Sequence, residues 1–117
     1  MTKIKNYIRG DSRNIAIQVY QSDGVTPLSL VGATVFFTVN ASNSPTDDSG
    51  AVISKTVTSH TNPALGQTTV SLLNTDTQNI TPGTYYYDVQ VKDVAGNILS
   101  QQQDQFLVIA DITRRIV

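Results

Sequence analysis

The sequence predicts an all-β protein, an antiparallel β-sandwich of about seven to eight short strands. Three observations support this fold class. Apolar and polar residues alternate over several short stretches, which is the period of a strand with one buried face. Turn-forming residues interrupt these stretches at intervals of roughly ten residues, as in antiparallel sandwiches. No stretch has the period of an amphipathic helix, and the chain has no cysteine, so the fold has no disulfide.

The length and composition of the chain fit a single domain over residues 1–117. Only 15% of the residues are charged, so Thr, Ser, Asn and Gln are expected to cover the surface. The net charge of −1 excludes a basic nucleic-acid footprint and a polybasic membrane patch. No apolar run is long enough to span a membrane, and the N-terminal residues do not lead into the apolar core of a signal sequence. We therefore expect the chain to be made in the cytoplasm, and to stay there or leave by lysis or within an assembly.

The first two strands are predicted over residues 3–8 and 13–20, with the Arg9-Gly10-Asp11-Ser12 turn between them. In the first strand the apolar candidates are Ile4 and Ile8. The second strand alternates clearly, and its inward residues are Ile15, Ile17 and Val19.

The segment that follows carries turn signals and one further clear strand. Residues 21–24, Gln-Ser-Asp-Gly, form a predicted turn because Asp can bond the backbone two residues further on. Residues 27–31 are predicted as a short edge segment, since Pro27 donates no ladder hydrogen bond. Residues 34–40 form a strand whose core face carries Val35, Phe37 and Val39. Residues 41–50 are rich in Ser, Asn and Asp and form the longest loop.

A weak strand, a loop and a more clearly alternating strand precede the central strand of the predicted fold. A strand is predicted at residues 52–57, and a loop follows at residues 59–66. Residues 67–73 alternate again, with Thr68, Val70 and Leu72 on one face. Residues 74–81 then cross back towards the central strand.

The central strand is predicted at residues 84–92, directly after the turn signal Pro82-Gly83. Its core face carries Tyr85, Tyr87, Val89 and Val91. A hairpin loop around Gly96 leads into a long last strand, residues 98–109. This strand has a polar middle at residues 100–105, where we expect a β-bulge because so long a strand must follow the twist of its sheet.

The alternation predicts a core made of inward residues from most of the strands. The predicted core residues are Ile15, Ile17, Val35, Phe37, Val70, Leu72, Tyr85, Tyr87, Val89, Phe106 and Val108. Residues 74–89 also follow an immunoglobulin-like sequence pattern, in which an Asp and then a Gly precede tyrosines at the start of the central strand. In such folds a tyrosine near the start of this strand bonds back to the preceding corner, and Tyr85 is the candidate.

No motif in the sequence predicts a catalytic, cofactor-binding or metal-binding residue, so we expect a protein that is not an enzyme. Arg9-Gly10-Asp11 spells the tripeptide that integrins read, but an ordinary turn is the preferred interpretation. His60 has no second His or Cys with which to share a metal and is predicted to be a solvated surface residue. Asp47-Asp48 lacks the ligand spacing of an EF-hand, so a polar loop tip is preferred over a calcium site.

Three features are candidates for contact with a partner. Tyr20, Phe36 and Tyr86 face outward and either form an exposed apolar patch or are covered by loops. Residues 101–105 carry glutamine amides that suit a neighbouring subunit or water. Residues 110–117 hold three large aliphatic side chains around two arginines, and we prefer an arm that docks on a partner over a frayed end.

Three stretches of the sequence resemble a known family. They are Arg9-Gly10-Asp11-Ser12 before a strand, Asp23-Gly24 with Pro27, Leu30 and residues 32–39, and residues 82–91 with Asp93 and Gly96. In this order they resemble the immunoglobulin-like structural domain of tailed bacteriophages, which begins baseplate upper proteins and occurs in related small virion proteins. The resemblance covers about residues 5–109.

This resemblance implies a non-catalytic building block of a virion, assembled in the host cytoplasm. Because no fibre, coiled coil or receptor-binding domain follows in this sequence, we expect an accessory or adaptor protein of the tail, baseplate, neck or fibre attachment. Its partners would be other virion proteins, in a symmetric oligomer, and neither nucleic acid nor a membrane. The alternatives are a capsid decoration protein and an adhesion or carbohydrate-binding immunoglobulin-like module, which would need clustered aromatic residues.

Overall fold

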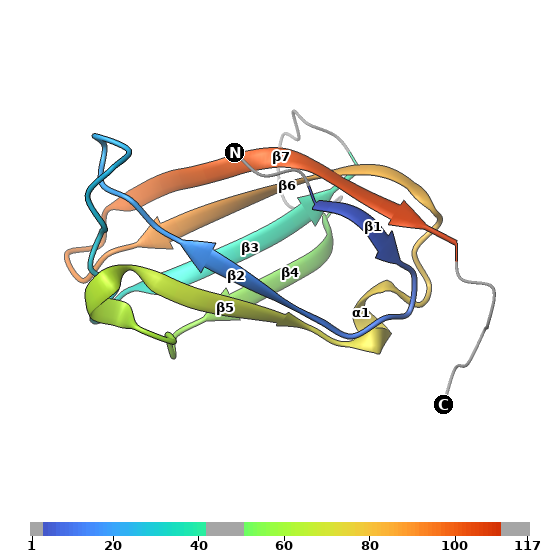
Figure 1. The fold of residues 1–117 in the computed structure, drawn as a ribbon, viewed down its shortest axis with the longest axis horizontal. Helices are drawn as coiled ribbons and strands as arrows, with labels where there is room; N and C mark the ends of the chain where they lie inside the picture. The colour runs from blue at the N-terminus through green and yellow to red at the C-terminus, as the bar shows by residue number, and fades with distance from the viewer. Residues whose placement is uncertain (1–3, 42–50, 111–117) are drawn as a thin grey trace.

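The structure is a computed structural model that describes residues 4–41 and 51–110 (Figure 1). The predicted all-β class is confirmed. The strands are β1 Ile4–Ile8, β2 Arg13–Gln18, β3 Thr34–Asn40, β4 Ala51–Val57, β5 Gln67–Leu72, β6 Gly83–Lys92 and β7 Ile98–Ile109. A 3₁₀ turn, η2 Pro63–Leu65, and a one-turn helix, α1 Asn74–Thr77, complete the described elements. The Asp47-Asp48 loop and the predicted arm beyond Ala110 lie outside the described residues.

The strands form two sheets that face each other. One sheet has five strands in the order β1-β7-β6-β3-β4, and the other pairs β2 with β5. Figure 1 shows β2 and β5 crossing in front of the larger, curved sheet. The expectation of a purely antiparallel arrangement is wrong in one place, because β1 runs parallel to β7. The turn after β1 carries the chain from one sheet to the other, so β1 pairs with the last strand instead of forming a hairpin with β2.

The predicted central strand lies in the middle of the larger sheet. β6 pairs with β3 from Thr34↔Lys92 to Asn40↔Tyr86 and with β7 over its whole length. Tyr85, near the start of β6, donates its hydroxyl hydrogen to the carbonyl oxygen of Thr81 at 2.6 Å. The predicted corner role of this tyrosine is therefore confirmed as a hydrogen bond.

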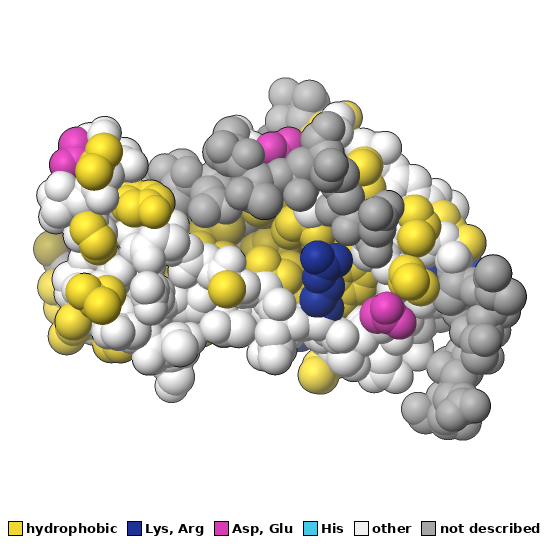
Figure 2. Space-filling view, in the orientation of Figure 1, with side chains coloured by type: hydrophobic (Ala, Val, Ile, Leu, Met, Phe, Trp, Pro, Cys, Tyr) yellow, Lys and Arg dark blue, Asp and Glu magenta, His cyan; other side chains and the backbone are white. Residues whose placement is uncertain are grey.

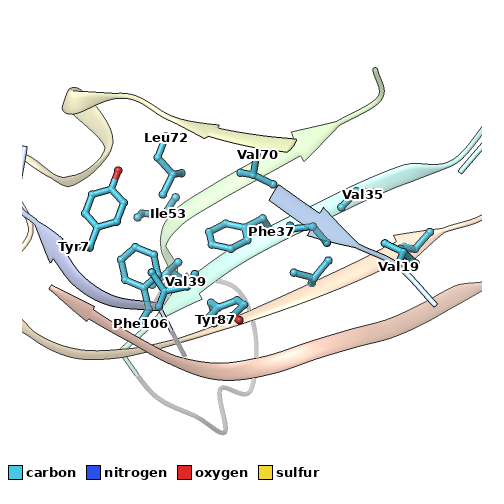
Figure 3. Packing of buried hydrophobic residues seen from close by; sticks show 14 of the residues in the cluster. Tyr7, Val19, Val35, Phe37, Val39, Ile53, Val70, Leu72, Tyr87 and Phe106 are labelled. Atoms are coloured by element: carbon cyan, nitrogen blue, oxygen red, sulfur yellow. The ribbon is translucent and has the colours of Figure 1, made fainter. Parts of the chain in front are cut away.

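Most of the predicted core residues are buried. The exceptions are Ile15 and Tyr85, which are half-buried and pack against the core cluster. Figure 3 shows the ring of Phe37 among side chains from both sheets. Its centroid lies 5.5 Å from that of Tyr87 and 6.4 Å from that of Phe106. Three strands of one sheet thus contribute the aromatic centre of the core.

The first strand buries a residue that the alternation did not predict. Ile8 is 40% exposed, whereas the ring of Tyr7 is buried against Phe106. The pairs Ile4↔Phe106 and Tyr7↔Val108 set three residues of β1 against two of β7, so an extra residue shifts the alternation. The Tyr7 hydroxyl donates to the carbonyl of Asp11 at 2.9 Å, and burial raises the pKa of Tyr7 to about 12.

The last strand contains the predicted bulge. Val89 pairs with Gln102 and Gln90 pairs with Ser100, which leaves Gln101 as the extra residue. The bulge therefore lies within the predicted polar stretch, and it allows a strand of twelve residues to follow the curvature of the sheet.

The predicted edge segment at residues 27–31 is not a strand. Only an isolated bridge, Tyr20↔Pro27, marks pairing there. The amide of Leu28 donates to the carbonyl of Val19 at 3.0 Å, and the amide of Leu30 donates to that of Pro63 at 2.7 Å. The segment divides its hydrogen bonds between Val19, just after β2, and η2, because Pro27 has no N–H with which to continue a ladder. This division places the side chain of Leu30 in the core.

Candidate functional site

Exposed hydrophobic side chains gather at one end of the sandwich, which we call the loop end. Its residues come from the β2–β3 connection, from η2, and from the β6–β7 turn and the strand after it. They are Tyr20, Val25, Val31, Leu65, Val94, Ile98 and Leu99. Figure 2 shows hydrophobic side chains gathered at this end, on the left of the view.

The three segments of the loop end are held together by contacts between them. The amide of Val19 donates to the carbonyl of Gly66 at 2.8 Å, which joins the start of the β2–β3 connection to the residue after η2. The β6–β7 turn lies against the β2–β3 connection, since a Cβ atom at Gly32 would be 3.3 Å from a methyl group of Val94. The loop end is therefore one connected surface and not a set of separate tips.

The tip that carries Val25 is stabilised by Asp23. The carboxylate of Asp23 accepts hydrogen bonds from the amides of Val25 at 2.9 Å and Thr26 at 2.8 Å, and from the hydroxyl of Thr26. These bonds, led by the one from the Thr26 hydroxyl, lower the pKa of Asp23. The side chain of Val25 remains 76% exposed on this fixed turn.

The β6–β7 turn is built in the same way. The carboxylate of Asp93 accepts hydrogen bonds from the amides of Asn97 at 2.8 Å and Ala95 at 3.0 Å, and from the side-chain amide of Asn97 at 3.2 Å. The bonds from Asn97 lower the pKa of Asp93. Val94 is 81% exposed at the tip. Binding of a partner to these two valines would cost little conformational entropy in this chain, because hydrogen bonds already order the two turns.

Both turns are expected to loosen in acid. A carboxyl group whose pKa is lowered in the folded state stabilises that state above its unfolded pKa, and the effect is lost as the pH falls through the lowered value. We expect the amide NMR shifts of Val25, Thr26 and Asn97 to titrate with midpoints below 3.8, the unperturbed value for these Asp residues.

The variant Asp23→Asn provides the control for this titration. It should abolish the transition at residues 25 and 26 while leaving the transition at Asn97 unchanged. Midpoints at or above the unperturbed value would contradict the proposed effect of the hydrogen bonds.

His60 is not the solvated surface residue that the sequence predicted. It is half-buried, and its Nε2 lies 2.8 Å from the carbonyl oxygen of Ala33. Because a carbonyl only accepts, Nε2 carries the hydrogen. Nδ1, 2.9 Å from the Thr68 hydroxyl, is then the acceptor in the neutral ring. The sequence held no signal for this link, since only the fold brings residues 33, 60 and 68 together.

The variant His60→Ala is expected to lower the free energy of unfolding by about 1–3 kcal/mol. The reason is that the hydroxyl of Thr68, which is buried, and the carbonyl of Ala33 both lose their hydrogen-bond partner. Urea unfolding followed by fluorescence measures the change. Thr61→Ala is the control, because it removes an exposed hydroxyl pair with Thr69 at the adjacent position. Equal destabilisation by the two variants would show that the histidine link contributes little.

The contact between His60 and Thr68 places an imidazole beside a hydroxyl, as in a base and nucleophile pair. The side chain of Thr68 is buried, so no substrate reaches it. Among the described residues there is also no group of three or more His, Cys, Asp or Glu side chains that could hold a metal ion.

A groove of about 350 Å³ runs between β4 and β5. Hydroxyl groups line most of it, including those of Thr56, Thr58 and Ser71. The one charged lining residue, Lys55, is paired with Asp76 at 2.9 Å. The groove therefore offers weak polar contacts and no reactive group.

The Arg9-Gly10-Asp11 tripeptide forms the predicted turn. Gly10 has φ of 88°, and its amide donates to the hydroxyl oxygen of Thr77 at 2.8 Å. The amide of Asp11 donates to the carbonyl of Ile8 at 3.0 Å. These bonds fix the turn against α1 and give the tripeptide a structural role.

The other predicted contact residues are dispersed. Tyr20 is bridged to Pro27 next to the smaller sheet, whereas Phe36 and Tyr86 are half-buried on the outer face of the larger sheet. Phe36 is opposite Gln90 and Tyr86 is opposite Asn40, so the three aromatic residues do not form one patch. In the amide-rich stretch, Gln103 is exposed and Gln105 half-buried.

The described part of the chain contains no helix with the length and apolar character needed to cross a membrane. No protein-family model and no curated protein sequence matches this chain.

Proposed function

We propose that this chain is a non-catalytic structural or adaptor protein of a tailed bacteriophage virion, which acts through protein–protein contacts in the tail, baseplate, neck or fibre attachment. The observation that carries the proposal is the loop end. It presents exposed aliphatic side chains on turns that are already hydrogen-bonded, and this supports binding to another protein because exposed apolar patches often mark protein contacts and ordered turns lower the entropy cost of binding.

The strand order supports the resemblance to the immunoglobulin-like phage domain. In immunoglobulin sandwiches, strands C, F and G share one sheet, and strands B and E belong to the other. Here β7, β6 and β3 are neighbours in one sheet and β2 pairs with β5 in the other, as this assignment would require. The hydrogen bond from Tyr85 to the carbonyl of Thr81 has the form of the tyrosine corner in such folds.

The surface chemistry of the described residues supports a role without catalysis. The one imidazole that touches a hydroxyl does so in the interior, and the groove between β4 and β5 is lined by hydroxyls and a paired lysine. We propose that the partners are other virion proteins, contacted in a symmetric oligomer after assembly in the host cytoplasm, and that neither nucleic acid nor a membrane is bound.

Incorporation into particles tests the proposal. We expect the wild-type chain in purified particles, and we expect Val94→Lys to reduce its amount at least about tenfold, because an ammonium group would be buried without a partner in the contact. Val52→Lys, an exposed valine on β4 outside the loop end, is the matched control and should be incorporated normally. Both variants should melt like the wild type. Absence of the wild-type chain from purified particles would overturn the proposed function.

A further inference from the structure

We infer that the loop end of one copy binds the opposite end of a second copy, so that copies associate head to tail. This inference names a partner for the protein contact proposed above and rests on that proposed function. The opposite end, which we call the helix end, exposes the large aliphatic residues Ile8, Leu73 and Ile109. Among the large exposed hydrophobic side chains of the described residues, only Val52 lies outside the two ends.

The helix end is a connected surface, as the loop end is. The amide of Arg9 donates to the carbonyl of Ile109 at 2.9 Å, which joins the ends of β1 and β7. The bond from the Gly10 amide to Thr77 joins the same turn to α1, and Leu73 is the residue that precedes this helix. Figure 1 shows α1 and the ends of β1 and β7 together on the right, away from the loops on the left.

The flat sides of the sandwich offer much less exposed aliphatic surface. The outward residues of β2 and β5 are Asn14, Ala16, Gln18, Gln67, Thr69 and Ser71. Figure 2 shows mostly polar, white surface over these two strands. On the outer face of the larger sheet, the aromatic residues Phe36 and Tyr86 are half-buried among Thr, Asp and Gln side chains. Contact through the ends would therefore bury more of the exposed aliphatic side chains than contact through the sides.

The charges of the two ends decide which ends meet. The described charged residues at the loop end are Asp23, Lys92 and Asp93, so carboxylates are in excess there. Among the residues that the structure describes, the helix end carries Arg9 and Arg13 with Asp11, together with the ion pair of Lys55 and Asp76, so basic groups outnumber carboxylates there. Two loop ends in contact would bring four carboxylates close together, whereas a loop end against a helix end brings opposite charges together.

Contact between two different surfaces is heterologous, and such contact produces rings where the rotation closes and filaments where it does not. Each copy would bury aliphatic side chains at both ends and leave its polar sides free. A symmetric oligomer of the kind proposed above follows directly from a closed ring of such contacts.

Two variants that each block one end test this inference. Val94→Lys adds a positive charge to the loop end, where the guanidinium groups of the next copy would lie. Leu73→Asp adds a negative charge to the helix end, and it is suited to folding because Leu73 is the N-cap of α1 and Asp is a preferred N-cap residue. Val52→Lys is again the control, and thermal melting checks that all three variants fold.

Sedimentation velocity over a range of concentrations gives the result. We expect the full-length wild type and Val52→Lys to associate as concentration rises. For each end variant alone, we expect the association constant to fall at least about tenfold. An equimolar mixture of Val94→Lys and Leu73→Asp should recover dimers, because one intact loop end and one intact helix end remain to meet.

Three results would overturn the inference. Association of Leu73→Asp at the wild-type level, with monomeric Val94→Lys, would mean that two loop ends bind each other. Failure of the mixture to form dimers would rule out the head-to-tail contact. A wild-type chain that stays monomeric at every concentration would rule out self-association, while the proposed function would still stand if Val94→Lys alone fails to enter particles.

Discussion

The variant Phe37→Ala is expected to lower the free energy of unfolding by about 3–5 kcal/mol. The Phe37 side chain is fully buried and packs between rings from β6 and β7, so its truncation leaves a cavity that neighbouring strands cannot close without breaking their ladders. Since small domains have a total free energy of unfolding of about 5–15 kcal/mol, this loss removes a large part of that stability. Equilibrium urea unfolding of the full chain measures it.

The adjacent residue gives a matched control. Phe36 lies on the same strand, has the same side chain and points to the opposite face, where it is half-buried. Phe36→Ala should cost clearly less than Phe37→Ala because solvent already reaches part of its ring. If Phe36→Ala were the more destabilising variant, the assignment of the core face of β3 would be wrong.

The second large effect is expected from Gly66→Ala, which should lower the free energy of unfolding by about 2–5 kcal/mol. Gly66 has φ of 70°, a conformation that costs an alanine energy. A Cβ atom there would lie 2.6 Å from the carbonyl oxygens of both Leu28 and Val19. Both atoms belong to backbone that is hydrogen-bonded into the loop end, so neither can move without breaking those bonds.

Gly24→Ala separates the cost of the backbone conformation from the cost of the close contact. Gly24 has a similar φ of 74°, but no heavy atom beyond its two chain neighbours lies within 4 Å of the position of its Cβ. Its substitution should cost only about 1–2 kcal/mol. Thermal melting of the two variants gives the comparison, and equal losses would mean that the approach of Val19 and Leu28 to Gly66 is looser than described.

The strands could be read from the sequence because their signal is local. In β3, β5 and β6 the inward residues recur at every second position, and each strand has one face on the core and one towards solvent. The polar middle of the last strand likewise predicted its bulge, now located at Gln101. The prediction of a short edge segment at residues 27–31 is wrong, because these residues form a loop that packs on the core and do not pair in a β-ladder.

Only parts of the candidate surface could be read in this way. The turns at Asp23 and Gly96 were predicted from Asp and Gly residues, whose conformational preferences act within a few positions. That Val25 and Val94 stand at the same end as Leu65 could not be predicted, because these residues are joined by the packing of segments distant in the chain.

The sequence by itself determined the all-β class, the positions of the strands, most of the core and the chemistry of the turns, because alternation and turn preference depend on near neighbours. The tertiary structure decided the parallel pairing of β1 with β7, the burial of Tyr7 in place of Ile8 and the link from His60 to Thr68 and Ala33. It also decided which exposed aliphatic residues share an end of the sandwich. The physical reason is that these features depend on which strand edges and loops meet when the two sheets close, and residues far apart in the chain make those contacts.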